Sequence, residues 1–221
     1  AALRHDSSGR VQIYLQLQPL ESCLLRTFTD DAVSGPSWVY WQTAGDATTI
    51  AGTWKVHFTD GGPVLPADIS TDHLASWTEI GDTEAKRFAG TGVYSITFNA
   101  PVQAGAGDWL LDVGKVAESA RVRVNGVDAG TLFSAPFQVH VGSLIHPGQN
   151  TLELEVTNLA SNRIRDLDIR GVKWKIFRDI NIVSPGAYGV FDASGWPLRD
   201  SGLLGPVKLV PLSAMDVGGG K

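Results

Sequence analysis

Stretches in which apolar and polar residues alternate recur along this chain, and turn-forming residues separate them. In RVRVNGVDAGTL, residues 121–132, Val122 and Val124 alternate with arginines. Successive side chains of a β-strand point to opposite faces of the sheet, so this pattern predicts one buried and one solvated face. Asn125 and Gly126 supply the two positive-φ residues that a type I′ turn requires. The run therefore predicts a β-hairpin, with a bulge or close approach at Gly130.

The same alternation predicts further strands in VQIYLQLQP, GTWKVHFTDGGP, GVYSITFNAP, DWLLDVGKVAESARVRVNG and NTLELEVTN. The 25 glycines and 11 prolines fall largely between these runs, where turns need them. No window sustains the apolar i, i+3, i+4, i+7 stripe of an amphipathic helix over three turns. We therefore predict an all-β fold, an antiparallel β-sandwich of short strands, with at most one helical turn in the connection 65–92.

Charge and hydropathy exclude some classes of partner. The formal net charge is −5, which gives no general attraction to nucleic acid or to an anionic membrane. No apolar run approaches the roughly 20 residues of a membrane helix. Residues 163–178 are locally basic, with six cations against two aspartates. A solvated strand face with ion pairs is the simpler interpretation of this basic segment, and contact with an acidic glycan is the alternative.

The ends of the chain have different patterns from its middle. We expect residues 1–34 to form N-terminal strands, either the end of a preceding domain or a segment packed on the sandwich. Residues 35–212 are expected to form the sandwich, and residues 213–221 a disordered tail. The single cysteine, Cys23, excludes an intrachain disulfide, and its apolar surroundings predict a small buried residue.

A resemblance to a known family enters at residues 109–158. This run resembles the sugar-binding jelly-roll domain of family 2 glycosidases such as β-galactosidases and β-mannosidases. The matching positions are Val124, Asn125, Gly126, Gly130, Pro136, Phe137, Gly148, Asn150, Leu152, Leu154, Val156 and Asn158. The resemblance implies a jelly-roll sandwich of the galactose-binding-domain-like type.

The C-terminal passage narrows the resemblance. WPLRDSGLLGPV, residues 196–207, is similar to the passage that closes the C-terminal β-domain of large bacterial α-L-rhamnosidases. The resemblance covers roughly residues 11–212. It implies a rhamnose- or galactose-containing glycan and the catalytic domain of a parent enzyme as partners, and a periplasmic or secreted bacterial location. The parent would remove terminal L-rhamnose from polysaccharides or from rhamnosylated small molecules.

Catalysis by this chain alone is not expected. In enzymes of the type it resembles, the catalytic carboxylates lie on a (β/α)₈ barrel of about 250 residues, and the sequence has no such organisation. Asp82 with Glu84, and Asp108 with Asp112, are the carboxyl pairs nearest to a glycosidase pattern, but their placement in turns and strands favours structural roles. We therefore assign no catalytic residue. No cofactor is required, although TDDAVSG, FTDGGP and RDLD could contribute ligands to a structural Ca²⁺, because calcium prefers carboxylate and loop carbonyl oxygens.

Sugar binding is the remaining functional interpretation. Protein sites for neutral sugars combine an aromatic ring, which stacks on the apolar face of the pyranose, with polar side chains that bond its hydroxyls. The predicted ligand-binding residues are Trp38, Tyr40, Trp41, Trp77, Asn158, Asn162 and Arg163. The structural alternative is that the aromatic residues plug the sandwich or face another domain, and that the polar ones tie a strand end to its loop. Two functions stay open: a carbohydrate-binding or structural accessory module, and an interdomain module without glycan affinity.

Overall fold

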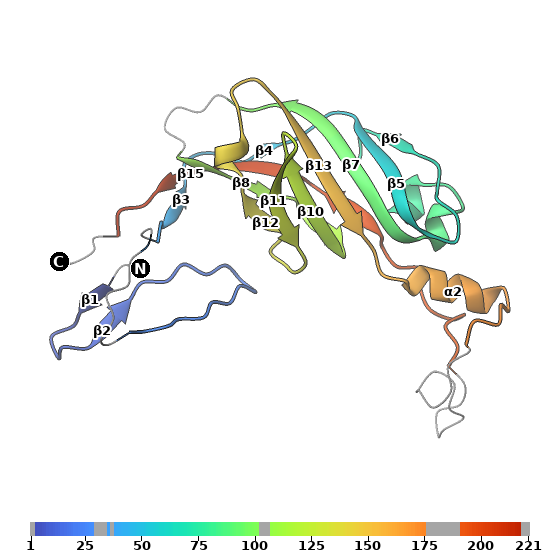
Figure 1. The fold of residues 1–221 in the computed structure, drawn as a ribbon, viewed down its shortest axis with the longest axis horizontal. Helices are drawn as coiled ribbons and strands as arrows, with labels where there is room; N and C mark the ends of the chain where they lie inside the picture. Colours follow the sequence, from blue (N-terminus) through green and yellow to red (C-terminus); the bar gives the residue numbers. More distant parts are fainter. Residues whose placement is uncertain (1–2, 29–34, 36–37, 102–106, 176–190, 218–221) are drawn as a thin grey trace.

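Two antiparallel sheets make up the centre of the molecule (Figure 1). The computed structural model describes residues 3–28, 35, 38–101, 107–175 and 191–217. The first sheet has the order β11-β10-β13-β7-β5-β6 and the second the order β12-β8-β15-β3, with β4 also paired to β15. All named strand pairs in the described residues are antiparallel. The predicted all-β antiparallel sandwich is therefore confirmed.

The six-stranded sheet consists of β5 (Trp54–Gly62), β6 (Ile69–Thr71), β7 (Ala89–Asn99), β10 (Ser119–Val124), β11 (Val127–Leu132) and β13 (Gln149–Thr157). The second sheet consists of β3 (Trp41–Thr43), β4 (Thr48–Thr49), β8 (Asp108–Asp112), β12 (Gln138–His140) and β15 (Lys208–Ala214). Two further pairs are β9 (Lys115–Ala117) with β14 (Gly202–Gly205), and β1 (Leu3–His5) with β2 (Val11–Ile13). The helical elements are α1 (Trp77–Ile80), α2 (Ser161–Ile169) and the 3-10 helices η1 (Ala85–Arg87) and η2 (Gly142–Leu144).

The core lies between the two sheets and comes from alternate residues of their strands. Leu152, Leu154 and Val156 of β13 are fully buried, as are Leu111 of β8 and Leu209 of β15 from the facing sheet. Each such side chain contributes about 1.5–3 kcal/mol relative to an exposed one. The intervening residues face solvent, which is the arrangement that the period-two pattern predicts.

The hairpin of β10 and β11 confirms its sequence prediction. Asn125 and Gly126 have φ angles of 52° and 77°, and the strands pair on either side of this turn. Gly130, at φ 122°, lies beside a register shift between Val122 and Arg123, which is the predicted bulge. Val122 is buried and Arg121 is exposed, as the alternation requires.

Two local predictions are wrong. Residues 163–169 of the segment expected as a strand face belong to helix α2 (Ser161–Ile169), although the expected ion pairs are present there. The helix gains stability from charged pairs three and four residues apart rather than from an apolar stripe, so hydrophobic periodicity does not reveal it. Cys23 is exposed rather than buried, because it lies in a segment, residues 21–28, that forms no helix or strand and whose residues are all exposed.

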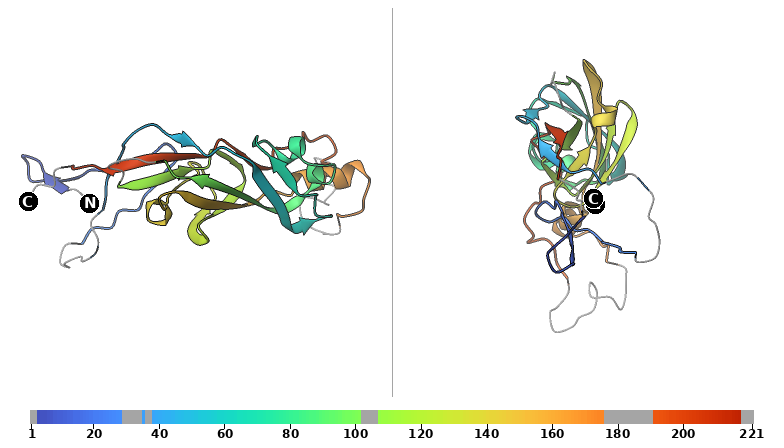
Figure 2. Two further views of the ribbon diagram at one scale, coloured as in Figure 1. Left: turned by 90° about the horizontal axis from the view of Figure 1, so that it is seen from above. Right: turned by 90° about the vertical axis from the view of Figure 1, so that its left-hand side faces the viewer.

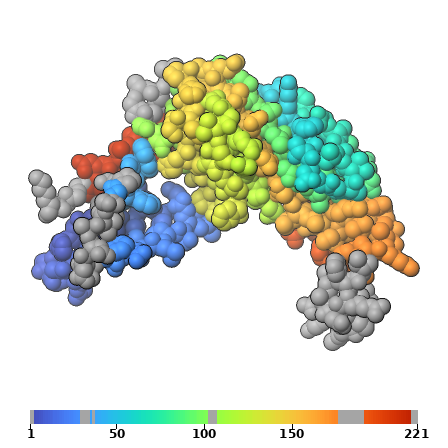
Figure 3. Space-filling view, in the orientation of Figure 1, coloured from blue at the N-terminus to red at the C-terminus, as the bar shows by residue number. Residues whose placement is uncertain are grey.

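The N-terminal residues 3–28, which we call the arm, lie outside the sandwich. Strand β2 covers only residues 11–13 of the predicted eight-residue strand, and β1 and β2 pair only with each other (Figure 1). Figure 2 shows an elongated molecule with both termini at one end and α2 at the other. Figure 3 shows the arm, in blue, beneath one end of the arched body. Apolar side chains of the arm are exposed: Leu3, Val11, Tyr14, Leu15, Leu17, Leu20, Leu24, Leu25 and Phe28.

The remaining boundaries differ in detail from the expectations. The connection 65–92 holds the expected helical turn, α1, together with η1 and β6. Strand β15 runs to Ala214, into the segment expected as a tail, and residues 218–221 lie outside the described residues. Among the described residues, no helix has the length and apolar character needed to span a bilayer.

Candidate functional site

Trp41 presents a partly exposed ring on the second sheet. It lies on β3, and its ring centroid is 5.7 Å from that of His140 on β12. The arm fixes its backbone, because the Gln16 side-chain amide donates to the Trp41 carbonyl (2.8 Å) and accepts from the Trp41 N–H (2.9 Å). Strand pairing and these two bonds fix the backbone that carries the ring.

His140 and Asp108 continue this surface. The Nδ1 of His140 lies 2.5 Å from Oδ2 of Asp108 on the adjacent strand β8. The other oxygen of Asp108 accepts the N–H groups of Trp109 (2.7 Å) and Gly142 (2.8 Å), so the carboxylate is fixed as well. We call Trp41, His140 and Asp108 the Trp41 face. An aromatic ring on a fixed strand, beside oriented polar groups, is the combination that a sugar hydroxyl and its neighbouring C–H face can use.

Trp38 precedes this face and is 64% exposed. Tyr40, in contrast, is only 4% exposed, because its ring packs edge-on against Tyr14 at 5.2 Å between centroids. The Tyr40 hydroxyl donates to the Tyr14 carbonyl (2.9 Å). The prediction of Tyr40 as a sugar platform is corrected: this residue fastens the arm to the sandwich. The structure thus brings Trp38, Tyr40 and Trp41 to one region but leaves only two of their rings accessible.

Trp77 also requires correction, since its exposed fraction is zero. It opens helix α1, and its ring packs against Phe58 (5.1 Å), Phe88 (5.9 Å) and Tyr94 (6.4 Å). The long connection wraps one end of the sandwich and inserts this ring into the core. Trp77 therefore has no ring face to offer a sugar in this structure.

Asn158 and Asn162 meet at Ser201. Asn158 accepts the Gly90 N–H (2.9 Å) and donates to the Phe88 carbonyl (2.9 Å) and to Ser201 Oγ (3.1 Å). Asn162, 3% exposed, donates to Ser201 Oγ as well (3.2 Å) and bonds both backbone groups of Arg199. Their bonding capacity is used within the fold, which is the structural alternative that the sequence left open.

Arg163 belongs to a group of arginines around Asp166. Oδ2 of Asp166 lies 3.0 Å from Arg163, 2.8 Å from Arg170 and 3.8 Å from Arg87 of η1. The Arg87 pair links α2 to η1, whereas the other two pairs lie within α2 and its C-terminal cap. The predicted ion pairing of the basic segment is confirmed for Arg163, Arg170 and Lys175, whereas Arg178 lies outside the described residues.

The four carboxylates that the sequence offered for catalysis are bonded within the fold. Asp82 accepts the N–H groups of Ala85 (2.9 Å) and Ala67 (3.2 Å). The Ala85 N–H in particular lowers the pKa of Asp82, against a smaller opposing effect of burial, whereas a general acid needs a raised pKa. Glu84 pairs with Arg87 at 2.5 Å. Asp108 belongs to the Trp41 face, and Asp112 accepts from Gly114 (2.8 Å) and Gln138 (2.9 Å).

Within the described parts of the chain, no three His, Cys, Asp or Glu side chains gather as a metal site. Most of the segment TDDAVSG lies outside them, so a structural calcium stays a prediction.

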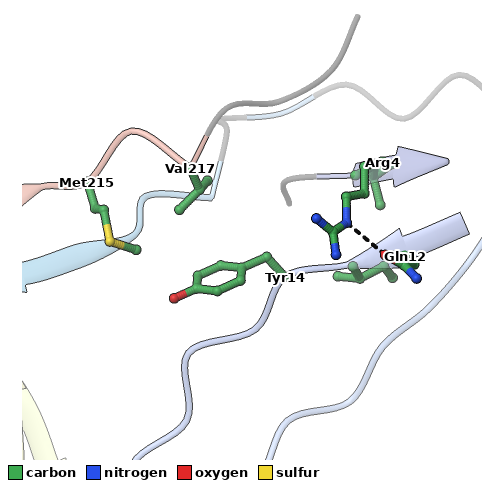
Figure 4. A pocket seen from close by; sticks show the side chains of 7 residues that line it. Arg4, Gln12, Tyr14, Met215 and Val217 are labelled. Carbon is green, nitrogen blue, oxygen red and sulfur yellow. Dashed lines mark hydrogen bonds between the residues drawn. The ribbon is translucent and has the colours of Figure 1, made fainter. Parts of the chain in front are cut away.

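A pocket of about 810 Å³ lies between the arm and the C-terminal segment. Figure 4 shows the Tyr14 ring between Met215 and the pair formed by Arg4 and Gln12, whose side chains are joined by a 2.7 Å hydrogen bond. Leu3, Ile13 and Val217 complete the lining, so the pocket is mainly apolar. The pocket lies where the arm meets the C-terminal segment, and its lining does not bring several polar groups together at one point.

The structure contains a second aromatic cluster that the sequence pattern does not predict. The rings of Trp174, Phe191 and Trp196 pack together next to α2. Helix α2 lies at the opposite end of the sandwich from β3 (Figure 1). The residues are separated in the sequence and show no strand alternation, and contacts between distant segments bring them together, including the hydrogen bonds of Asp168 and of Lys175. The sequence KWK at 173–175 was the one available signal.

Comparison with known proteins places these features in context. No protein-family model matches the chain. A protein described as a putative beta-glucuronidase, from Formosa agariphila, is 36% identical over 183 residues, which correspond to 72% of this chain and 15% of that protein. The structure of a rhamnosidase from Novosphingobium sp. PP1Y matches 80% of this chain and 16% of its own, with 31% identity and a TM-score of 0.57. This chain resembles a module of large glycoside hydrolases.

The predicted resemblance is thereby confirmed, for a part of those proteins only. This chain spans about 15% of the length of the curated relative and 16% of the rhamnosidase. A FMN-binding beta-glucuronidase from Facaelibacterium prausnitzii L2-6 also matches, at 22% identity over 76% of this chain and 23% of its own, with a TM-score of 0.47.

Proposed function

We propose that this chain is a non-catalytic accessory module of a longer glycoside hydrolase resembling α-L-rhamnosidases, and that it binds carbohydrate. The match to the Novosphingobium rhamnosidase carries the proposal, because it includes most of this chain but a small part of that enzyme. The described residues form a filled sandwich, and the carboxylates considered for catalysis are bonded within it. The reaction would then take place on a catalytic domain outside these 221 residues.

The Trp41 face supplies the proposed contact with the glycan. The exposed part of the Trp41 ring stacks on the C–H face of a rhamnose or galactose unit, and His140 with Asp108 bonds its hydroxyls. Trp38 extends the contact to a neighbouring unit. The partners would be a rhamnose- or galactose-containing glycan and the catalytic domain, in a bacterial periplasm or outside the cell.

Calorimetric titration of the chain with rhamnose- and galactose-containing oligosaccharides tests this proposal. We expect saturable heat, and we expect Trp41→Ala to weaken binding about tenfold, which corresponds to roughly 1.4 kcal/mol. Phe133→Ala is the matched control, because Phe133 is 79% exposed and follows β11 of the other sheet. Equal affinity of Trp41→Ala and the wild type contradicts the assignment of this face, and hydrolysis of an aryl rhamnoside by the purified chain contradicts a non-catalytic role.

The exposed apolar residues of the arm favour a second candidate function, that of an interdomain module without glycan affinity. Leu20 and Leu24 are 81% and 101% exposed, and seven other apolar residues of the arm are exposed with them. Groups of exposed apolar side chains of this kind mark interaction surfaces. Absence of heat with rhamnose, galactose and uronate oligosaccharides would favour this candidate over the first.

A further inference from the structure

Two aromatic rings and two lysines line a pocket beyond helix α2, and a third ring packs beside them. The pocket has a volume of about 720 Å³, and its lining includes Asp168, Lys173, Trp174, Lys175, Phe191 and Asp192. Sites for small molecules commonly occupy 300–1,000 Å³. None of Trp174, Phe191 or Trp196 belongs to the core cluster, so these rings do not plug the sandwich.

The rings meet at right angles. Trp174 and Phe191 lie 6.2 Å apart between centroids with an interplanar angle of 89°, and Phe191 and Trp196 lie 5.5 Å apart at 87°. Trp174 and Phe191 are both half-buried and both line the pocket, so part of each ring is accessible at this corner. Such a corner matches a pyranose, which has an apolar C–H face and a polar rim.

Lys175 supplies a polar group between two of the rings. Its ammonium lies 5.5 Å from the Trp174 centroid and 5.4 Å from the Phe191 centroid. It donates to the Phe191 carbonyl (2.6 Å) and pairs with Oδ1 of Asp168 (2.9 Å). A lysine ammonium has three N–H donors, so one is left for a ligand hydroxyl.

Asp168 holds the pocket in shape. Its side chain is only 5% exposed, and its oxygens accept the Trp174 Nε1–H (2.7 Å) and the Ala193 N–H (2.7 Å) in addition to Lys175. Burial raises the pKa of Asp168, but these donors outweigh it and the net pKa is lowered, so the carboxylate stays charged. One side chain thus fixes the Trp174 ring, the lysine and the chain on the far side of the pocket before any ligand arrives.

The charges of the pocket favour a neutral ligand. Lys173 and Lys175 are balanced by Asp168 and Asp192. Because these charges cancel, an anionic sugar would gain little electrostatic attraction. Hydroxyl groups, in contrast, can both donate to the carboxylates and accept from the ammonium groups.

We propose that this pocket binds one neutral pyranose unit, with its C–H face on Trp174 and its rim hydroxyls on Lys173, Lys175 and Asp192. The proposal rests on the proposed function as a glycan-binding module and adds a second contact site, at the opposite end of the sandwich from the Trp41 face. One long glycan, or two separate glycans, then bind the module at both ends.

Titration of the full chain with methyl α-L-rhamnopyranoside and methyl β-D-galactopyranoside, followed by calorimetry and by ligand-observed NMR, tests the pocket. We expect Trp174→Ala to weaken binding of at least one of them about tenfold. Lys175→Met, which keeps the aliphatic stem and removes the donors, is expected to weaken it severalfold. Trp41→Ala serves as the matched variant at the other site, and thermal melting of each variant verifies that it is folded. Exposed Lys173→Ala provides a further variant that leaves the Asp168 bonds intact, and we expect it to weaken binding about twofold.

The outcomes separate the two proposals. If sugar binding persists in folded Trp174→Ala, Lys175→Met and Lys173→Ala but is lost in Trp41→Ala, the pocket is excluded while the proposed function stands. Tighter binding of methyl glucuronide than of both neutral glycosides excludes the neutral ligand class. Absence of any sugar binding overturns the pocket and the glycan-binding function together.

Discussion

Burial separates three core tryptophans of the described residues from two largely accessible ones, and Trp41 and Trp174 are intermediate. Trp54, Trp77 and Trp109 are at most 9% exposed and build the core, whereas Trp38 and Trp196 are 64% and 38% exposed. The sequence predicts Trp54 and Trp109 correctly, because they lie in alternating strands. It misplaces Trp77, because the irregular connection 65–92 gives no indication of which of its residues turn inward. Aromatic identity alone is therefore a weak guide to a binding platform.

The polar residues predicted to bind sugar, Asn158 and Asn162, also could not be judged from residue type alone. Asn158 and Asn162 are bonded to residues as distant in sequence as Phe88 and Arg199. No local pattern can reveal such partners. Residue type indicates that a side chain can bond a sugar, and only the fold shows that its bonds are already formed.

Asp168 gives a prediction on pH dependence. Its pKa is lowered in the folded protein, so the unfolded chain binds more protons near that pKa, and the carboxylate contributes stability above the ordinary aspartate pKa of about 3.9. This contribution falls as the pH drops through the folded pKa. We expect Asp168→Asn to be less stable than the wild type at pH 7, with the difference shrinking below pH 4. Urea denaturation from pH 7 to pH 3 measures it, and a difference independent of pH contradicts the assignment.

At the level of elements, prediction succeeds where the determinants are local. The β10–β11 hairpin follows from strand alternation and the Asn125–Gly126 turn, which lie within a few residues of each other. Helix α2 escapes prediction because its contacts are mainly polar, including ion pairs to η1 and within itself, and its apolar residues form no stripe. The Trp174 pocket escapes for a related reason, since its walls come from segments on either side of residues 176–190.

Two glycines with positive φ allow the stability cost of backbone strain to be measured apart from the cost of overpacking. Gly126 (φ +77°) has open space where a Cβ would lie, whereas a Cβ on Gly202 (φ +87°) in β14 would lie 2.5 Å from Trp77 Nε1 and from the Tyr94 hydroxyl oxygen. We expect Gly126→Ala to cost about 1 kcal/mol for its φ angle. Gly202→Ala is expected to cost about 1–3 kcal/mol more, because the methyl group overpacks the Trp77 end of the core. Urea denaturation of the two variants checks this difference, and equal costs would show that the end of the core is loosely packed.

At the scale of the whole molecule, the sandwich has two distinct ends. The arm, both termini and the Trp41 face lie at one end, and α2 with the Trp174 pocket lies at the other (Figures 1 and 2). The exposed apolar residues concentrate on the arm, which touches the sandwich through Tyr14 and Gln16. This distribution is consistent with a module that contacts another protein domain through the arm and binds glycan through the accessible rings. The sequence predicts the sandwich and its resemblance to glycosidase domains, but it does not predict that these surfaces lie at opposite ends.

The most direct test of a glycan-binding module without its own reaction centre is one titration with a rhamnose-containing oligosaccharide, followed by chromatography of the recovered sugar. We predict saturable heat and an intact oligosaccharide. Release of monosaccharide by the purified chain, or no heat at concentrations up to the millimolar range, would contradict the account.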